Sequence, residues 1–153
     1  MIPISRVVID NLHLFLRIMD NLVNLLITDL RRLDGVEKCV NLSSSEAANL
    51  KKYETFLSKT CKINFHFYTC KDTSSLKWRD LTGPEKYVLL SRIDLPDLFP
   101  NLPNAVHIQK VWTEFATLNE SIRSESMSTS EVRAFASKAK LWLELFTQVH
   151  QSM

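Results

Sequence analysis

Glycine is scarce in this sequence, which contains only Gly35 and Gly83 among its 153 residues. The loops that hold the phosphates of nucleoside triphosphates or dinucleotides need several closely spaced glycines, because the backbone there approaches the ligand. Two isolated glycines exclude both kinds of loop. Gly35 follows a long apolar run, and we expect it to end a helix in the left-handed conformation that glycine readily takes.

Cysteine is also scarce, and the three residues Cys39, Cys61 and Cys70 cannot all pair within one chain. No secretory signal precedes them, so we expect reduced thiols and an intracellular location, in the nucleus or the cytoplasm. Cys61 and Cys70 flank His66 in the pattern C-x4-H-x3-C, which matches no common zinc motif. In an extended segment they would lie about 30 Å apart, too far to share one ion.

A strong excess of one charge and an uninterrupted apolar span are both missing. Nineteen basic residues against seventeen acidic ones give a formal net charge of +2, which marks neither a strong nucleic-acid binder nor a membrane-surface protein. The apolar-periodic residues 6–33 are interrupted by Asp10, Arg17 and Asp20, and so fail the test of roughly eighteen consecutive apolar residues for a membrane span. We therefore expect no membrane partner.

Residues 6–33 predict the central helix, because apolar side chains recur there at three- and four-residue steps. These are Leu12, Phe15, Leu16, Met19, Leu22, Val23, Leu26, Leu30 and Leu33. A second set widens the stripe: Leu14, Ile18, Leu25 and Ile27. We expect the helix to be buried on more than one side, by the chain or by a partner. Just before it, residues 7–9 are β-branched and favour a short strand that ends at Asp10.

Four further helices are predicted at about 46–59, about 84–93, 103–122 and 128–149. Serines at 43–45 precede the first, and capping boxes are expected at Thr82 with Glu85 and at Ser128 with Glu131. The last helix shows Val132, Phe135, Ala136, Ala139, Trp142, Leu143, Phe146 and Val149 at helical spacing.

Two segments do not fit a helix. Residues 62–69 alternate between polar and apolar at period two and give the clearest strand prediction. Residues 94–103 carry three prolines and predict an irregular connector, packed through Leu98 and Phe99. The sum predicts a mainly α fold for residues 1–153: an irregular bundle of about five helices with one or two short strands, as a single domain or as a fragment of a larger α/β protein.

Asp10 is the candidate metal ligand. A carboxylate at the end of a buried strand is held rigidly enough to bind a divalent ion, although chemistry with two metal ions needs several such groups. The alternative is that Asp10 caps the first helix. His13, Arg17 and Asp20 lie along one edge of that helix, either as a holder of phosphate or carboxylate or as an ordinary solvated edge.

Lys77, Trp78 and Arg79 form the candidate nucleic-acid contact. Residues 51–86 hold eight Lys and Arg against four Asp and Glu, with aromatic residues between them. Basic side chains beside an exposed ring can bind a phosphate backbone and stack a base. The alternative places Trp78 in the core.

Three segments carry a resemblance: RVVIDNLHLFLRI, LKWRDLTGPEK and PNLPNAVHIQKVW. They resemble segments of uncharacterised, multicopy proteins of animal and fungal genomes that derive from mobile elements. If those proteins are transposase-like, the resemblance implies a ribonuclease-H-like core that uses Mg or Mn, with Asp10 as the one acidic ligand that we can assign. Residues 35–153 would then resemble a helical insertion between two catalytic acids.

Two functions follow from these observations. The first is a fragment or remnant of a transposase-like protein, without activity as an isolated chain because no complete set of acids is identifiable. Its partners would be DNA and the missing part of the protein. The second is a helical protein–protein interaction module whose first and last helices bind other chains.

Overall fold

The computed structural model describes residues 11–35, 47–70, 75–123 and 128–151, and the structural statements that follow concern those residues. As predicted, this part of the chain is mainly helical, with six helices and one two-stranded antiparallel sheet. The elements are α1 (Asn11–Asp34), α2 (Ala48–Lys59), β1 (Tyr68–Thr69), β2 (Leu76–Lys77), α3 (Gly83–Arg92), α4 (Leu95–Leu98), α5 (Ala105–Ile122) and α6 (Thr129–Gln151).

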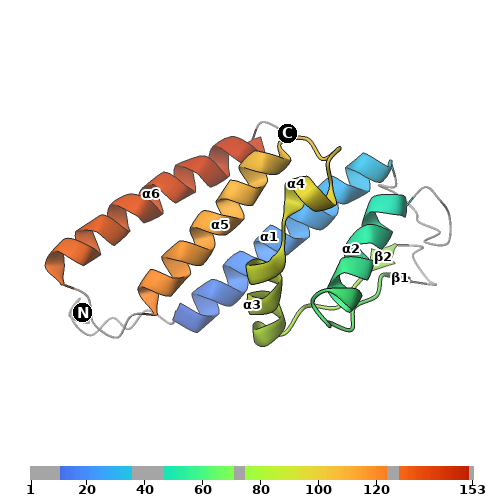
Figure 1. Ribbon diagram of the computed structural model, residues 1–153, viewed down its shortest axis with the longest axis horizontal. Coiled ribbons are helices and arrows are strands. Elements are labelled where there is room, and N and C mark those ends of the chain that lie inside the picture. The colour runs from blue at the N-terminus through green and yellow to red at the C-terminus, as the bar shows by residue number, and fades with distance from the viewer. Residues whose placement is uncertain (1–10, 36–46, 71–74, 124–127, 152–153) are drawn as a thin grey trace.

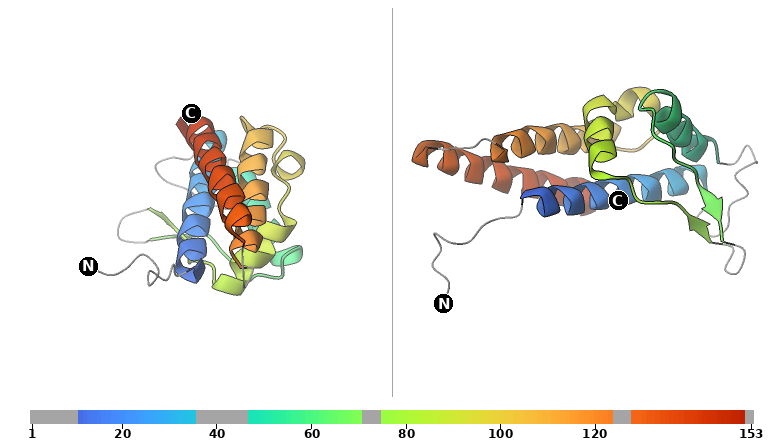
Figure 2. Two further views of the ribbon diagram at one scale, coloured as in Figure 1. Left: turned by 90° about the vertical axis from the view of Figure 1, so that its left-hand side faces the viewer. Right: turned by 90° about the horizontal axis from the view of Figure 1, so that it is seen from below.

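The three long helices pack together at one end of the molecule. Figure 1 shows α1 crossing most of the length, with α5 and α6 beside its N-terminal half, and the left view of Figure 2 looks along this three-helix bundle. The other half of α1 lies beside α2 and the small sheet. α1 contacts α2, α3 and α5, and α5 also contacts α3, α4 and α6.

The predicted stripe of α1 forms the centre of the core. Met19, Leu26 and Leu30 are completely or almost completely buried. The Phe15 ring stacks on Tyr87 of α3 at 4.1 Å between centroids and on Phe115 of α5 at 5.8 Å. The first turn departs from the prediction, because Leu12 and Leu14 are 56% and 41% exposed. The neighbouring helices therefore do not cover both apolar sides of α1 at its start.

α1 ends where the sequence predicts, and its last residue caps the next helix. Gly35 has a positive φ of 70°. Asp34 Oδ1 accepts hydrogen bonds from the backbone and side-chain nitrogens of Asn49, at 3.1 and 2.7 Å, and Oδ2 accepts from the Leu50 backbone at 3.0 Å. The serines at 43–45, expected to precede α2 as caps, lie outside the described residues. Asp34 satisfies two of the first amides of α2, those of Asn49 and Leu50.

The strand predicted at 62–69 is wrong in length. Burial alternates along it as expected, but only Tyr68–Thr69 pairs with Leu76–Lys77. Upstream of that pairing, Glu54 Oε2 accepts from the Phe67 backbone at 2.9 Å and Arg79 Nε donates to Asn64 O at 2.8 Å. These side chains bond backbone groups that a neighbouring strand would otherwise bond.

The irregular connector predicted at 94–103 contains a short helix, α4. Pro96 occupies its first turn, where a missing N–H costs nothing, and Asp94 Oδ1 accepts from the Asp97 backbone at 3.2 Å. The predicted packing is confirmed, since Phe99 is fully buried and Leu98 packs against the core. From α5, the Gln109 side chain accepts from Leu95 N at 2.8 Å and donates to Ile93 O at 3.1 Å.

Both predicted capping boxes are present. The Thr82 hydroxyl accepts from Glu85 N at 3.4 Å, and Glu85 Oε2 accepts from Thr82 N at 2.8 Å. The corresponding distances for Ser128 and Glu131, at the start of α6, are 3.2 and 3.0 Å. These reciprocal bonds fix where α3 and α6 begin.

α6 is buried along a narrower side than its apolar pattern predicts. Trp142 and Val149 are buried, but Val132 and Leu143 are 50% and 57% exposed and Ala136 is exposed as well. α5 is the one helix with which α6 makes extensive contact among the described elements. One neighbouring helix covers only the middle of a broad apolar arc, so the flanks of α6 stay in solvent.

Candidate functional site

The candidate metal ligand, Asp10, and the β-branched residues 7–9 lie outside the described residues. The described helix begins one residue later, at Asn11. Metal binding by Asp10 therefore stays a prediction. Within the described part of the chain, no three side chains of the metal-binding types gather in one place.

The three residues of the candidate nucleic-acid contact lie on and just after β2, and they face different surroundings. Lys77 is exposed, whereas Trp78 is half-buried and meets the Phe67 ring edge-on at 5.9 Å between centroids. Trp78 thus packs against the core without being one of its buried members. It offers less ring surface to a stacked base than an exposed tryptophan would.

Arg79 is held by its own chain. Its guanidinium nitrogens donate to both oxygens of Glu85, at 2.9 and 3.0 Å, and to the carbonyls of Asp80 and Asn64. The hydrogen bonds from Arg79 are the largest cause that lowers the pKa of Glu85 to about 2. The same pairing raises the pKa of Arg79. A phosphate would have to compete with a carboxylate for this fork of donors.

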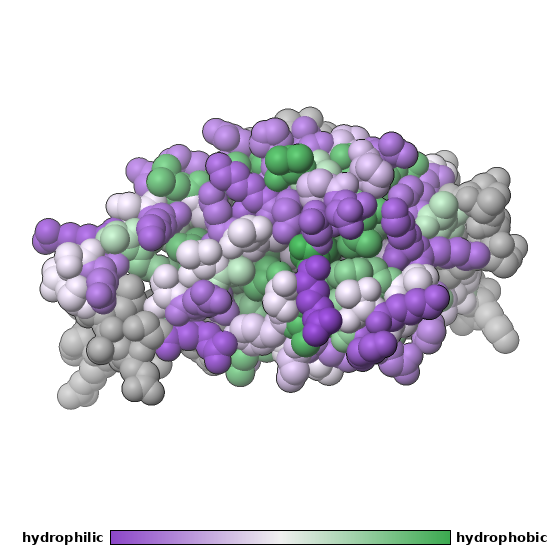
Figure 3. Space-filling view, in the orientation of Figure 1, coloured by the Kyte–Doolittle hydropathy of each residue, from purple (hydrophilic) through white to green (hydrophobic). Residues whose placement is uncertain are grey.

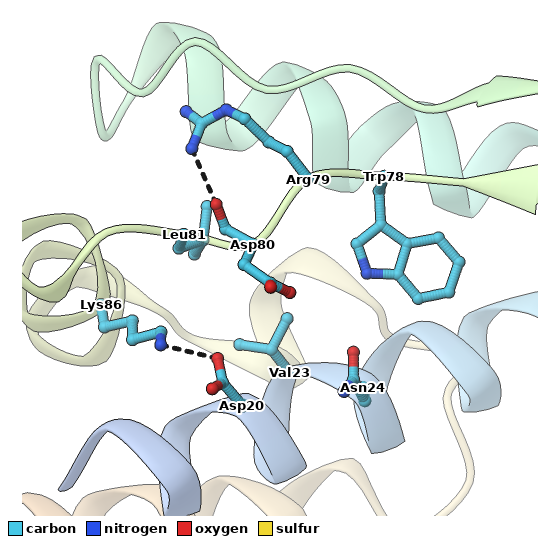
Figure 4. A pocket seen from close by; sticks show the side chains of 8 residues that line it. All are labelled: Asp20, Val23, Asn24, Trp78, Arg79, Asp80, Leu81 and Lys86. Carbon is cyan, nitrogen blue, oxygen red and sulfur yellow. Dashed lines mark hydrogen bonds and ion pairs between the residues drawn. The ribbon is translucent and has the colours of Figure 1, made fainter. Parts of the chain in front are cut away.

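A small hollow lies between this segment and α1. It is lined by Asp20, Val23, Asn24, Trp78, Arg79, Asp80, Leu81 and Lys86. Figure 4 shows Asp80 and Trp78 reaching toward α1, while Arg79 is directed away from it. The buried Lys86 donates to Asp20 Oδ1 at 2.6 Å. The free volume is about 10 Å³. That volume is about the size of one water molecule, so the hollow is a packing junction and holds no ligand-sized space.

The polar edge of α1 does not form a convergent site. Asp20 is engaged by Lys86, and His13 and Arg17 stay exposed on the helix surface. A buried lysine needs a compensating charge, and Asp20 supplies it. The structural role of Asp20 is therefore to accept the ammonium group of Lys86 and join α1 to α3.

Cys61, His66 and Cys70 have different environments. The Cys61 thiol is buried, and burial raises its pKa against the opposing effect of Arg92. His66 is exposed, with its Nδ1 at 3.9 Å from Glu54 Oε1. Cys70 is half-buried beside the hairpin, where its backbone N–H donates to Ser75 O at 2.9 Å.

Among the described residues, the buried polar atoms without a hydrogen-bond partner include Asp29 Oδ2, Tyr53 Oη and both ring nitrogens of His150. Burial raises the pKa of Asp29, opposed by Arg32, and raises the pKa of Tyr53 as well. Burial lowers the pKa of His150. The three lie on separate elements, α1, α2 and α6, and share no pocket among those described.

A larger open groove runs between α5 and α6. It has a volume of about 280 Å³ and is lined by Glu114, Thr117, Leu118, Lys138, Leu141 and Trp142. Leu118 and Trp142 are buried, whereas Leu141 is 62% exposed. Figure 3 shows that apolar side chains reach the surface between polar ones on the face of the molecule where α5 and α6 lie.

One contact fixes the shape of this groove. Trp142 Nε1 donates to Val111 O at 2.8 Å, and the Trp142 ring packs at 5.6 Å from Phe115. α6 is therefore locked to α5 through its middle, with Leu141 directed to one side of the contact. Sequence reasoning missed this groove. The sequence feature that could have indicated it is the wide apolar arc of α6, which one neighbouring helix cannot cover.

Comparison of the chain with protein-family models, with curated proteins and with solved structures finds no match. In the part of the chain that the structure describes, no helix is both long and apolar enough to cross a membrane.

Proposed function

We propose that this chain works as a helical protein–protein interaction module and that its docking surface is the groove between α5 and α6. One observation carries the proposal: Leu141 is 62% exposed beside the buried Trp142 and Leu118, in a groove of about 280 Å³. Complete burial of an exposed leucine side chain by a partner contributes about 1.5–3 kcal/mol to the free energy of binding.

The groove has the form that binding of a helix requires. Its floor is apolar and its rims carry a carboxylate, a hydroxyl and an ammonium group, from Glu114, Thr117 and Lys138. An amphipathic helix binds such a groove through apolar side chains, and the polar rims fix its orientation. Because the floor is held by the bond from Trp142 to Val111, the site is formed before a partner arrives.

Site-specific photo-crosslinking tests the proposal. A photoreactive phenylalanine derivative replaces Leu141 in one variant and Leu143 in a matched control. Both side chains are more than half exposed on α6, at 62% and 57%, but they lie about 200° apart around the helix. We expect protein adducts from position 141 at several times the yield from position 143, with no change when EDTA is added. Equal yields, or none from position 141, would contradict the proposal.

The resemblance to mobile-element proteins supports a second proposal: the chain is a fragment or remnant of a transposase-like protein without activity alone. Its acidic candidate is Asp10, and Mg or Mn would be its cofactor. Binding of Mg²⁺ or Mn²⁺ that is lost in Asp10→Ala supports this origin, and equal binding by both proteins argues against it.

Contact with DNA belongs to the same second proposal. Reversing the charge of Lys77 and Arg79 should abolish a salt-sensitive DNA interaction, because each contact with a phosphate releases a counterion. Unchanged binding of the double variant in a gel-shift titration would remove this proposal. Glu85→Gln is an informative companion, since it removes the carboxylate charge that competes with a phosphate for Arg79 and leaves the basic residues unchanged.

A further inference from the structure

The two rims of the α5–α6 groove carry opposite charge. Glu114 on α5 has a carboxylate side chain that is 43% exposed, and its nearest described cation is Lys110 at 3.8 Å on the same helix. Lys138 is exposed on α6. Both side chains line the same groove, together with Leu141.

We infer that the partner is a second copy of this chain, docked groove to groove; this inference rests on the proposed function. A two-fold axis along the groove places α5 of each copy over α6 of the other. Glu114 of one copy then faces Lys138 of the second copy, and the reverse pair forms at the same time. Self-complementary surfaces of this kind are the basis of two-fold symmetric dimers.

The direction of the helices suits this arrangement. Figure 1 shows that α5 and α6 run antiparallel. Rotation about an axis parallel to the groove leaves the direction of each helix along the groove unchanged. α5 of the second copy therefore also runs antiparallel to α6 of the first. The dimer is then an antiparallel four-helix bundle, in which Leu141 of each copy leaves solvent and packs against the opposite groove.

The charge pattern favours a copy over an unrelated chain. A groove with two rims of the same charge would repel a second copy. With one acidic and one basic rim, two attractive pairs form between the copies. The contact of Glu114 with Lys110 does not prevent this pairing, because an exposed ion pair at 3.8 Å on one helix contributes little to stability. Glu114 can therefore turn to Lys138 of the second copy at little cost.

The surface is of the right size for a weak dimer. The 18 residues of α5 are about 27 Å long, and two adjacent helices of about 10 Å each give a face of about 500 Å² in projection. Standard interfaces bury about 800 Å² on each partner, and transient ones bury less. We therefore expect an association that depends on protein concentration and not a permanent dimer.

Exchanging the rim charges tests this arrangement. The variants Glu114→Lys and Lys138→Glu are compared with the wild type by sedimentation equilibrium, each alone and as an equimolar mixture. Each variant alone brings like charges together twice, and we expect its self-association to weaken at least about tenfold. The mixture restores both opposite pairs, so we expect it to associate about as well as the wild type. Rescue by mixing excludes misfolding as the cause of the loss.

Lys140→Glu is the matched control. It makes the same charge change on an exposed residue of α6, about 200° around the helix from Lys138, and we expect no effect on association. A wild-type chain that stays monomeric at high concentration would overturn the second copy as partner. So would single variants that associate normally, or a mixture that is not restored. If crosslinks from position 141 still join another protein in that case, the proposed function survives this failure; without such crosslinks, both fail.

Discussion

Trp142 of α6 donates its indole N–H to the backbone oxygen of Val111 in α5, at 2.8 Å and out of contact with solvent. The bond joins residues 31 positions apart and sets the depth at which α6 lies on α5. Of the two leucines next to Trp142 in the chain, Leu141 lines the groove.

Trp142→Phe should loosen this attachment. The variant keeps an aromatic ring against Phe115 but removes the N–H donor and leaves a space, so we expect a loss of about 2–4 kcal/mol in the free energy of unfolding. Denaturant unfolding gives the value. Leu143→Phe, at an exposed position of the same helix, serves as the control and should change stability by less than about 0.5 kcal/mol. Equal effects of the two substitutions would show that the indole contact does not hold α6.

Asp34→Ala should destabilise α2. The carboxylate accepts three hydrogen bonds from Asn49 and Leu50, and the loss of a helix cap costs about 0.5–2 kcal/mol. We expect a value near the upper end, with faster hydrogen exchange in the first turn of α2. Asp94→Ala removes the single 3.2 Å cap of the four-residue α4 and should cost less. A larger cost for Asp94→Ala would contradict this ranking.

The Arg79 and Glu85 pair predicts a sensitivity to acid. The pKa of Glu85 is lowered from 4.5 to about 2, so its contribution to stability is present above about pH 4.5 and is lost as the pH falls toward 2. Because Arg79 is 40% exposed and solvent screens the pair, we expect a contribution of at most about 1 kcal/mol. Glu85→Gln should flatten the stability profile between these pH values. An unchanged profile would show that the pair does not contribute.

His150 predicts a second dependence on pH, nearer to neutrality. Burial lowers its pKa below 6.5, so the unfolded chain binds a proton before the folded chain does. Stability is therefore complete above about pH 6.5 and falls as the pH drops through the lowered pKa. His150→Phe keeps the packing on Phe146, whose ring centroid lies 4.6 Å away, and should remove this slope in thermal unfolding. If the variant shows the same dependence of stability on pH, groups other than His150 cause it.

The sequence was sufficient for most features that one chain segment determines by itself. The period of α1, the left-handed Gly35 and the capping boxes of Thr82 and Ser128 are all local, and all are confirmed. α4 was missed although its signals were local too, since Asp94 can cap and a proline in the first turn does not break a helix.

What the sequence could not predict depends on contacts between distant residues. Alternation in 62–67 correctly indicates which side chains are buried, but no local pattern reveals that Glu54 and Arg79 replace a neighbouring strand. In the same way, the apolar pattern of α6 predicts a helix, but it does not show whether α5 will cover Trp142 or Leu141. The groove between α5 and α6 emerges only from that choice.

The most direct test of the central claim is a dilution series followed by ¹H–¹⁵N NMR spectra of the wild-type chain. If the α5–α6 groove docks a second copy, peaks that shift with concentration should cluster at Thr117, Leu118, Lys138 and Leu141, while those of α2 stay in place. Glu114→Lys should remove the shifts. Concentration-dependent shifts that cluster on α2 or the hairpin, or spectra that do not change with concentration, would contradict the claim.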